Sequence, residues 1–182
     1  SSNKNYNILI NNYKKNITER NLLLKNNSFD EDWMQKIECN IVKFGIDIYK
    51  KRIDIINIIN QILNVINNDN HFSNNFILQI KDDFLDKKDN FFDNQDIYLS
   101  ELKIKRNIDI FTGGCTIGPH RSDIIGYNTV NKFNLSQLST GQQKTMVLLI
   151  IIAQSKYLID TLSIRPIILL DTSDSYIFFT NC

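Results

Sequence analysis

The chain has 182 residues, of which 42% are hydrophobic and 23% are charged. This is enough apolar material for one or two compact units, and it excludes disorder as the global state. The formal net charge of +1 excludes a bulk charge imbalance as the basis of nucleic-acid binding, so any such surface has to be a local patch.

Signals for export, membrane insertion and structural metal are weak. The longest apolar run, Met146 to Ala153, has eight residues, short of the roughly 18 to 20 that cross a bilayer. The first residues lack the apolar core and cleavage site of a secretory signal, which indicates a cytoplasmic location. Three widely separated cysteines without a CxxC pair predict neither a zinc site nor a disulfide scaffold: Cys39, Cys115 and Cys182.

Two amphipathic helices are predicted in the first third of the chain. Ser28 and Glu31 form a capping-box pattern, so the second helix should begin just after Ser28. The short Asn-rich link before it favours an antiparallel helix pair. The first helix is indicated by helical spacing of Leu9, Tyr13, Ile17 and Leu24.

The second predicted helix carries two heptad-like seams, interrupted only by Lys51, and would be on the order of 48 Å long. Such a length is typical of an arm. The seams also support an alternative function, a non-enzymatic helical module that pairs with another protein. The seam residues are Met34, Ile41, Ile48, Ile55 and Ile62, and Ile37, Phe44, Ile58 and Val65.

A strand and a third helix follow. The apolar run from Phe76 to Ile80 comes after Ser and Asn residues that favour a turn, which predicts a short strand. A helix is predicted from Asp93 to Arg106, with Asp93 as its cap and Asp96 favourably placed in the first turn.

The composition of the sequence changes after this predicted helix. From Ile108 onward, glycines divide the chain into short apolar runs, which is typical of strands and turns. We therefore predict a boundary near residue 106, with a helical lobe over residues 1–106 and an α/β segment over residues 107–182.

The motif GPHRSD, Gly118 to Asp123, is a Gly-Pro turn that presents His120 and Arg121 together. A histidine and an arginine on a rigid turn suit contact with phosphate, because a guanidinium binds two oxygens at once and keeps its charge. The alternative, which spacing alone favours, is a solvated turn in which Arg121 pairs with Asp123.

The motif LSTGQQK, Leu138 to Lys144, comes directly before an apolar helix. Ser139 or Thr140 can cap that helix, and Gly141 allows backbone amides to approach an anion closely. The start of a helix attracts anions because its free N–H groups and its positive dipole end point outward. The alternative is an ordinary capped helix with no ligand.

The motif RPIILLD, Arg165 to Asp171, contains four aliphatic residues after Pro166. This pattern favours a central parallel strand that is buried on both faces and ends in a carboxylate. Ligands in open α/β sheets bind beyond the carboxyl ends of the strands, so Asp171 is placed to hold a Mg²⁺-bound water near a nucleotide.

In this order the three motifs resemble the carboxy-terminal part of the RecF family, bacterial gap-repair ATPases related to the heads of SMC and Rad50 proteins. GPHRSDI, LSTGQQK and PIILLD look like its motifs, and KKNITERNLLLK resembles the start of its helical lobe. The resemblance extends from about residue 6 to Asp171. It implies a mixed α/β fold, with a helical lobe of long antiparallel helices and the carboxy-terminal part of an ABC-type ATPase head.

The resemblance also implies a function. Members of this family bind DNA in an ATP-dependent way, act with RecO and RecR proteins, and help to load recombinase at single-strand gaps. DNA replication, recombination, repair and the SOS response are the processes implied. ATP and Mg²⁺ are the implied cofactors, and the implied partners are gapped and duplex DNA and a second copy bound in an ATP-dependent homodimer, with no membrane.

Candidate site residues follow from the same resemblance. Asp171 would serve the Mg²⁺ of its own head through a water molecule. The resemblance leaves open the role of the GPHR residues, which are Gly118, Pro119, His120 and Arg121. The residues that would face a nucleotide held by a second head are Ser139, Thr140, Gly141 and Gln142.

The sequence departs from the family pattern at two points. No GxxxxGK followed by Ser or Thr occurs, so no phosphate-binding loop is present and the chain alone should bind ATP poorly. Thr172 follows Asp171 where the family has the acidic residue that orients water. ATPase activity is therefore left open, and an inert gene remnant is a further alternative for a chain whose residues 172–182 lack the family pattern.

Overall fold

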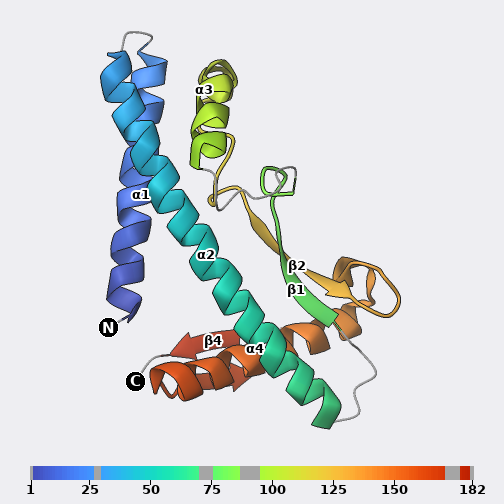
Figure 1. Cartoon of the computed structure of the whole chain (residues 1–182). Coiled ribbons are helices and arrows are strands. Elements are labelled where there is room, and N and C mark those ends of the chain that lie inside the picture. The colour runs from blue at the N-terminus through green and yellow to red at the C-terminus, as the bar shows by residue number, and fades with distance from the viewer. Residues whose placement is uncertain (1, 27–29, 70–75, 87–94, 171–176, 181–182) are drawn as a thin grey trace. The chain divides into compact units, whose positions relative to one another are not determined.

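The computed structural model describes residues 2–26, 30–69, 76–86, 95–170 and 177–180 (Figure 1). The helices are α1 (Ser2–Lys25), α2 (Glu31–Asp69), α3 (Gln95–Thr112) and α4 (Thr140–Leu162), with a short 3-10 helix at Leu135–Gln137. The strands are β1 (Phe76–Lys81), β2 (Asp123–Asn128), β3 (Ile167–Leu170) and β4 (Ile177–Thr180). The predicted mixed α/β fold with a helical lobe is confirmed.

The contacts divide the chain into two compact units. The first unit consists of residues 1–53 and 81–123, and the second consists of residues 54–80 and 124–182. Helix α2 contributes residues to both units. This grouping by contact does not test the division of roles at residue 106, which stays a prediction.

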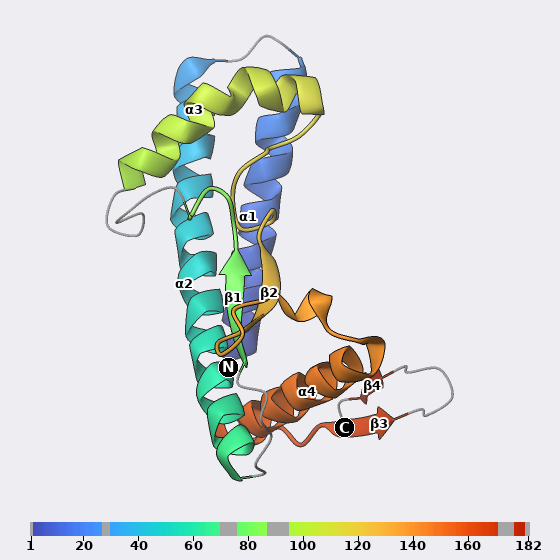
Figure 2. The ribbon, with the colours of Figure 1, turned by 90° about the vertical axis from the view of Figure 1, so that its right-hand side faces the viewer.

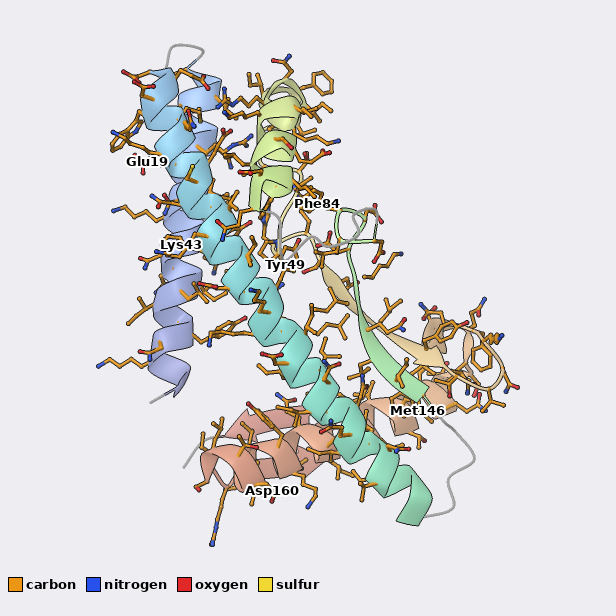
Figure 3. The ribbon with its side chains drawn as sticks, in the orientation of Figure 1. Glu19, Lys43, Tyr49, Phe84, Met146 and Asp160 are labelled. Carbon is orange, nitrogen blue, oxygen red and sulfur yellow. The ribbon has the colours of Figure 1, made fainter. Side chains whose placement is uncertain are left out.

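The first unit is built from α1, the first part of α2 and α3. Figure 2 shows α3 lying across the two long helices. Figures 1 and 2 both show α1 beside the first part of α2, which confirms the predicted helix pair. Tyr49 and Phe84, labelled in Figure 3, both belong to its core. The core residues are Tyr13, Ile37, Ile41, Val42, Ile46, Ile48, Tyr49, Phe84, Tyr98, Leu102, Cys115 and Ile117.

The predicted seams of α2 hold only in its first part. Met34, Ile41 and Ile48 are at most 1% exposed, but burial then moves one position along the helix, to Ile56 and Leu63. A straight helix has 3.6 residues per turn, so a strict seven-residue repeat drifts by about 20° per heptad. Because Met34, Ile41 and Ile48 are buried within the first unit, the seam to which they belong is not free to pair with another protein.

The start of α2 differs from the capping box that the sequence predicted. Ser28 lies outside the described residues, and the helix begins at Glu31. The side chain of Asp30 accepts a hydrogen bond from the backbone N–H of Trp33 at 3.0 Å, so Asp30 acts as the cap. A carboxylate there also interacts favourably with the positive end of the helix dipole.

Helix α3 ends later than the predicted Arg106, and its predicted cap Asp93 lies outside the described residues. The helix continues to Thr112, and Asp109 on its last turn is buried, at 2% exposure. Gly113 then takes a positive φ of 77°, and the N–H of Gly114 bonds to the carbonyl of Asp109 at 3.0 Å. This is the usual way in which a glycine ends a helix.

The second unit packs the last part of α2 against β1, β2 and α4. The side-chain amide of Asn60 on α2 bonds to both the N–H and the carbonyl of Leu78, at 2.8 and 2.9 Å, and so fixes β1 to the helix. β1 and β2 pair in a two-stranded sheet. The core includes Met146 (Figure 3) and consists of Ile56, Ile59, Leu63, Phe76, Leu78, Leu135, Met146, Leu149 and Ala153.

Helix α4 is more apolar than its longest uninterrupted run suggested. Among the described residues it is the one helix long and apolar enough to cross a membrane, with a mean hydropathy of 1.5 over 18 residues. This is weak evidence for a membrane span, because core helices of soluble proteins pass the same test. Part of α4 does serve as a core helix, through Met146, Leu149 and Ala153.

The predicted central parallel strand is wrong in its pairing. β3 begins after Pro166 as predicted, but it pairs antiparallel with β4, with Ile167 opposite Thr180 and Leu170 opposite Ile177. Ile167 is 45% exposed, so this end of the strand is not buried on both faces. Pairing follows the nearest apolar segment in the sequence, which gives a local antiparallel pair within the part of the chain that the structure describes.

Candidate functional site

The GPHR motif forms the predicted turn, in the first unit. The N–H of Arg121 bonds to the carbonyl of Gly118 at 2.8 Å. Gly118 has a φ of 119°, which side chains rarely allow, and an added Cβ would lie 2.3 Å from the hydroxyl of Tyr98 and 2.4 Å from that of Tyr13. The turn therefore rests directly on two buried tyrosines, and its first residue has to be glycine.

One backbone carbonyl holds both polar side chains of the motif. The carbonyl of Cys115 lies 2.9 Å from Nε2 of His120 and accepts from Nε of Arg121 at 3.0 Å. A carbonyl can only accept, so Nε2 carries the proton, and Nδ1 accepts from the hydroxyl of Tyr13 at 2.8 Å. Arg121 thus has a backbone partner that neither interpretation of the sequence included.

A second arginine secures the turn from α2. Nη1 of Arg52 donates to the hydroxyl of Ser122 at 2.9 Å and to the carbonyl of Pro119. Ser122 donates to the same carbonyl at 2.8 Å. Pro119 itself is fully buried. These hydrogen bonds to the carbonyls of Gly118 and Pro119 make the GPHR turn a rigid element of the first unit.

A pocket of about 470 Å³ lies beside Arg121. Its lining carries both signs of charge. The basic residues are Lys81, Lys105 and Arg121, and the acidic residues are Asp82, Asp83, Glu101 and Asp123. Because these charges offset one another, the pocket favours neither a simple anion nor a simple cation. It does not by itself assign a ligand to the motif.

We expect the stability of the first unit to fall as the pH is lowered from about 7.5 to 5.5. Burial lowers the pKa of His120 below its ordinary value. The unfolded chain then binds a proton near pH 6.5 that the folded chain does not, so stability is lost as the pH falls through this range. Urea unfolding at several pH values, followed by the fluorescence of Trp33, measures the effect. The H120Q variant should flatten the profile, and an unchanged slope would contradict the assignment.

The LSTGQQK motif begins α4, in the second unit. Ser139 is its N-cap, and its hydroxyl accepts from the N–H of Gln142 at 3.4 Å. The side chain of Gln142 accepts in return from the N–H of Ser139 at 3.1 Å, which completes a capping box. The predicted cap is confirmed, and the side chains of both residues are used within the turn.

Nothing in the described part of the fold requires a glycine at position 141. It lies exposed in the first turn of α4, it is not among the glycines with positive φ, and no described atom lies within 4 Å of an added Cβ. Glycine in a helix costs about 1 kcal/mol relative to alanine. The start of α4 is therefore open to solvent, and Gly141 has no structural role there that alanine could not fill.

The third motif lies only partly within the described residues, through Arg165 to Leu170. Asp171 and Thr172 lie outside the described residues, so the predicted Mg²⁺ role of Asp171 stays a prediction. Among the residues with described positions, no group of three His, Cys, Asp or Glu side chains could hold a metal ion. The GPHR turn and the LSTGQQK turn belong to different units, and each is described by itself.

The sequence analysis missed a buried ionic cluster in the first unit. Arg20 on α1 is fully buried and donates to Glu38 on α2 at 3.0 Å and to Asp109 on α3 at 2.7 Å. Its remaining terminal nitrogen donates to the carbonyl of Leu102 at 2.7 Å. Arg20 stands at the helical spacing of the apolar stripe that includes Ile17 and Leu24, and a charge in such a stripe was the available signal.

The cluster extends to the surface through Arg106. Its guanidinium bonds to both carboxylate oxygens of Glu38, at 3.0 and 2.7 Å, and to Glu31 at 2.8 Å. Hydrogen bonding to Glu38 raises the pKa of Arg106, and hydrogen bonding to Arg106 lowers the pKa of Glu31. Ion pairs and hydrogen bonds of Arg20 and Arg106 thereby join α1, α2 and α3.

We compared the sequence of the chain with protein families and with curated proteins. No protein-family model matches the chain. A curated protein of Rickettsia canadensis, "DNA replication and repair protein RecF", is 33% identical over 75 residues, which are 41% of this chain and 21% of that protein. A protein of the same name from Allorhizobium ampelinum is 24% identical over 159 residues, which are 87% of this chain and 42% of that protein.

Comparison with solved structures gives the same result for fold. The structure of the recombination mediator protein RecF-ATP in the RecFOR pathway matches with a TM-score of 0.76 at 22% identity. The match covers 93% of this chain and 46% of that chain. A second RecF structure of the same pathway, with ATPrS, matches with a TM-score of 0.74 and is covered to 43%. Over part of its sequence and in its fold the chain is therefore similar to RecF proteins, as its motifs predicted, and it spans less than half the length of the relatives that it matches.

Proposed function

We propose that this chain is part of a RecF-type DNA repair protein that binds DNA in an ATP-dependent way at single-strand gaps. In this proposal it acts in the cytoplasm with RecO and RecR type proteins and supports recombinase loading and the SOS response. The relatives named for DNA replication and repair and for the RecFOR pathway support it. The ATP named with one structural neighbour supports ATP as the nucleotide. We propose Mg²⁺ as the ion that accompanies it.

The observation that carries the proposal is the open glycine at the start of α4. Ser139, Thr140, Gly141 and Gln142 would face a nucleotide held by a second head. Free N–H groups and the helix dipole favour an anion at this position, and the absence of a side chain at Gly141 lets a phosphate approach the backbone. A residue that weakens its own helix and that the fold does not require is best explained by such a ligand.

The remaining motifs have defined places in the proposal. Asp171 would hold a Mg²⁺-bound water in its own head. Gly118, Pro119, His120 and Arg121 form a rigid turn in the first unit, and the proposal assigns no ligand to this turn. The phosphate-binding loop, which this sequence lacks, would have to be supplied by another segment, so we make no claim of ATPase activity for this chain alone.

A Gly141→Ala substitution tests the proposal. It should raise the stability of the chain by about 0.5–1 kcal/mol, because alanine is the better helix former. The same substitution should abolish ATP-dependent dimerisation once an amino-terminal half with a phosphate-binding loop is supplied. Unfolding by urea and sedimentation velocity with and without ATP provide the two measurements.

The matched control is Gly114→Ala. There an added Cβ meets only Asn21, at an ordinary contact distance of 3.7 Å, and the site lies far from the proposed nucleotide in sequence. This control should dimerise like the unchanged protein. Dimerisation of Gly141→Ala at unchanged ATP concentration would refute the role of this glycine.

A further inference from the structure

We infer that Gln143, the second glutamine of the LSTGQQK motif, is a positioning residue that holds the turn at the start of α4 in its orientation. The inference rests on the proposed function, because that turn carries Gly141 and would face a nucleotide. Neither the cap of the helix nor the nucleotide contact proposed above uses this side chain. The capping box of Ser139 and Gln142 lies within the turn itself, so it does not fix the turn to the segment that precedes it.

The side-chain amide of Gln143 joins the first turn of α4 to the backbone ahead of it. Its Nε2 donates to the carbonyl of Ser136 at 2.9 Å and to that of Leu138 at 2.9 Å. An amide nitrogen carries two hydrogens, and this contact uses both of them. The backbone N–H of the same residue bonds to the carbonyl of Ser139 at 2.9 Å. We call the two side-chain hydrogen bonds the Gln143 clamp.

The segment that the clamp holds is anchored in the core of the second unit. Leu135, which begins the short 3-10 helix, is 9% exposed and belongs to that core, and Leu138 packs against it. Asn134 caps the same 3-10 helix, because its side chain accepts from the N–H of Ser136 at 2.9 Å. The Gln143 clamp therefore ties the start of α4 to a segment whose own position is fixed by burial and by a cap.

The residue type at position 143 fits this role. The first turn of α4 has the sequence TGQQK and contains no acid, although the helix dipole favours a carboxylate near the start of a helix. A glutamate at position 143 would gain that interaction. Its ionised oxygens could not donate to the carbonyls of Ser136 and Leu138, however, and would repel them. Glutamine has the same length as glutamate and supplies both donors.

The competing explanation is an ordinary polar residue on an exposed helix, with hydrogen bonds that add nothing to the turn. The two explanations predict opposite signs for the effect of Gln143→Glu on thermal stability. Through the helix dipole alone, the substitution should raise the Tm slightly. Through loss of the clamp, it should lower the Tm by about 2–4 °C.

The first test uses the full chain without nucleotide. The chain has six glycines, so nitrogen-15 glycine labelling gives a simple spectrum in which the Gly141 signal is assigned by its loss in Gly141→Ala. In Gln143→Glu the order parameter of the Gly141 N–H should fall from about 0.85 to below about 0.6, as expected for a turn that has come loose. The order parameter of Gly126, in β2 of the same unit, should stay unchanged.

Two further variants separate the clamp from charge and from the helix. Gln143→Met keeps the length of the side chain but has no donor and no charge, so it should loosen Gly141 in the same direction and to a smaller degree. The matched control is Gln154→Glu, which makes the same chemical change at an exposed position of α4. This control should leave the Gly141 order parameter unchanged and should not lower the Tm.

The second test supplies an amino-terminal half with a phosphate-binding loop, as for the proposed function. Gln143→Glu should raise the ATP concentration for half-maximal dimerisation by about tenfold, the effect expected from the loss of one or two hydrogen bonds. Gln154→Glu should dimerise at the same ATP concentration as the unchanged protein. Circular dichroism shows that each variant is folded at the temperature of the measurement, so a change in stability alone would not move this concentration.

Two outcomes would overturn the inference. The first is a Gln143→Glu variant with a raised Tm and an unchanged Gly141 order parameter. The second is a loosened Gly141 together with an unchanged ATP concentration for dimerisation. If the unchanged protein does not dimerise with ATP, the proposed function is refuted, and the first test still decides whether Gln143 holds the turn.

Discussion

An Arg20→Met substitution should lower the free energy of unfolding by about 3–5 kcal/mol, the range for breaking a buried ion pair from one side. The guanidinium of Arg20 neutralises Glu38 and Asp109 where neither carboxylate can reach bulk water easily. Methionine fills similar space but leaves Asp109 without its cation and the carbonyl of Leu102 without its donor. The single tryptophan, Trp33, lies on α2 in the same unit, so its fluorescence during urea unfolding reports the loss.

Two further variants separate charge from geometry. Arg20→Lys keeps the charge but cannot reach three acceptors in the fork arrangement, so its loss should be smaller and still measurable. Lys156→Met breaks an exposed pair with Asp160 and should change stability by no more than about 0.5 kcal/mol. If Arg20→Met proved as mild as Lys156→Met, the buried cluster would not be holding the three helices together.

A Gly118→Ala substitution should destabilise the first unit by about 2–6 kcal/mol. An L-residue at a φ of 119° costs about 1–3 kcal/mol in backbone strain. The added methyl group also comes within 2.4 Å of two tyrosine hydroxyls, and overpacking of this kind costs about 1–3 kcal/mol more. Thermal unfolding followed by circular dichroism, together with Trp33 fluorescence, measures the change.

Removal of the two hydroxyl groups provides the specific control. In the G118A background, Y13F and Y98F together take away the atoms at 2.4 and 2.3 Å, so they should recover the packing part of the loss and leave the backbone part. In the unchanged background the same pair should destabilise, because Nδ1 of His120 loses its donor. The sign of the tyrosine effect should therefore reverse between the two backgrounds, and the same sign in both would contradict the geometry.

Local patterns predicted the elements of this chain well. Helical spacing located α1, α2 and α4, and the LSTGQQK motif placed the cap of α4 at Ser139, because capping depends on residues within one turn. The glycine of the GPHR turn was recognised as part of a turn for the same reason. Its two tyrosine neighbours were not, since Tyr13 and Tyr98 come from two different helices, α1 and α3.

Long-range partners were beyond the sequence alone. The aliphatic run of β3 was correctly a strand, but burial and the direction of pairing depend on which other strands are present, and here β4 is its neighbour. For Arg121 the sequence analysis considered an acidic side chain or a phosphate as the partner, because a guanidinium is positively charged. In the structure Arg121 donates to the carbonyl of Cys115. Backbone acceptors carry no sequence signal, so such contacts are seen only in three dimensions.

The peptide between Cys115 and Thr116 joins the buried cluster to the GPHR turn. On one side, the N–H and hydroxyl of Thr116 donate to Asp109 at 2.8 and 2.7 Å, and Asp109 is held by Arg20. On the other side, the carbonyl of Cys115 holds His120 and Arg121. A displacement of α1 relative to α3 would therefore disturb the partners of His120 and Arg121 at the same time, because a single peptide lies between the helices and the turn.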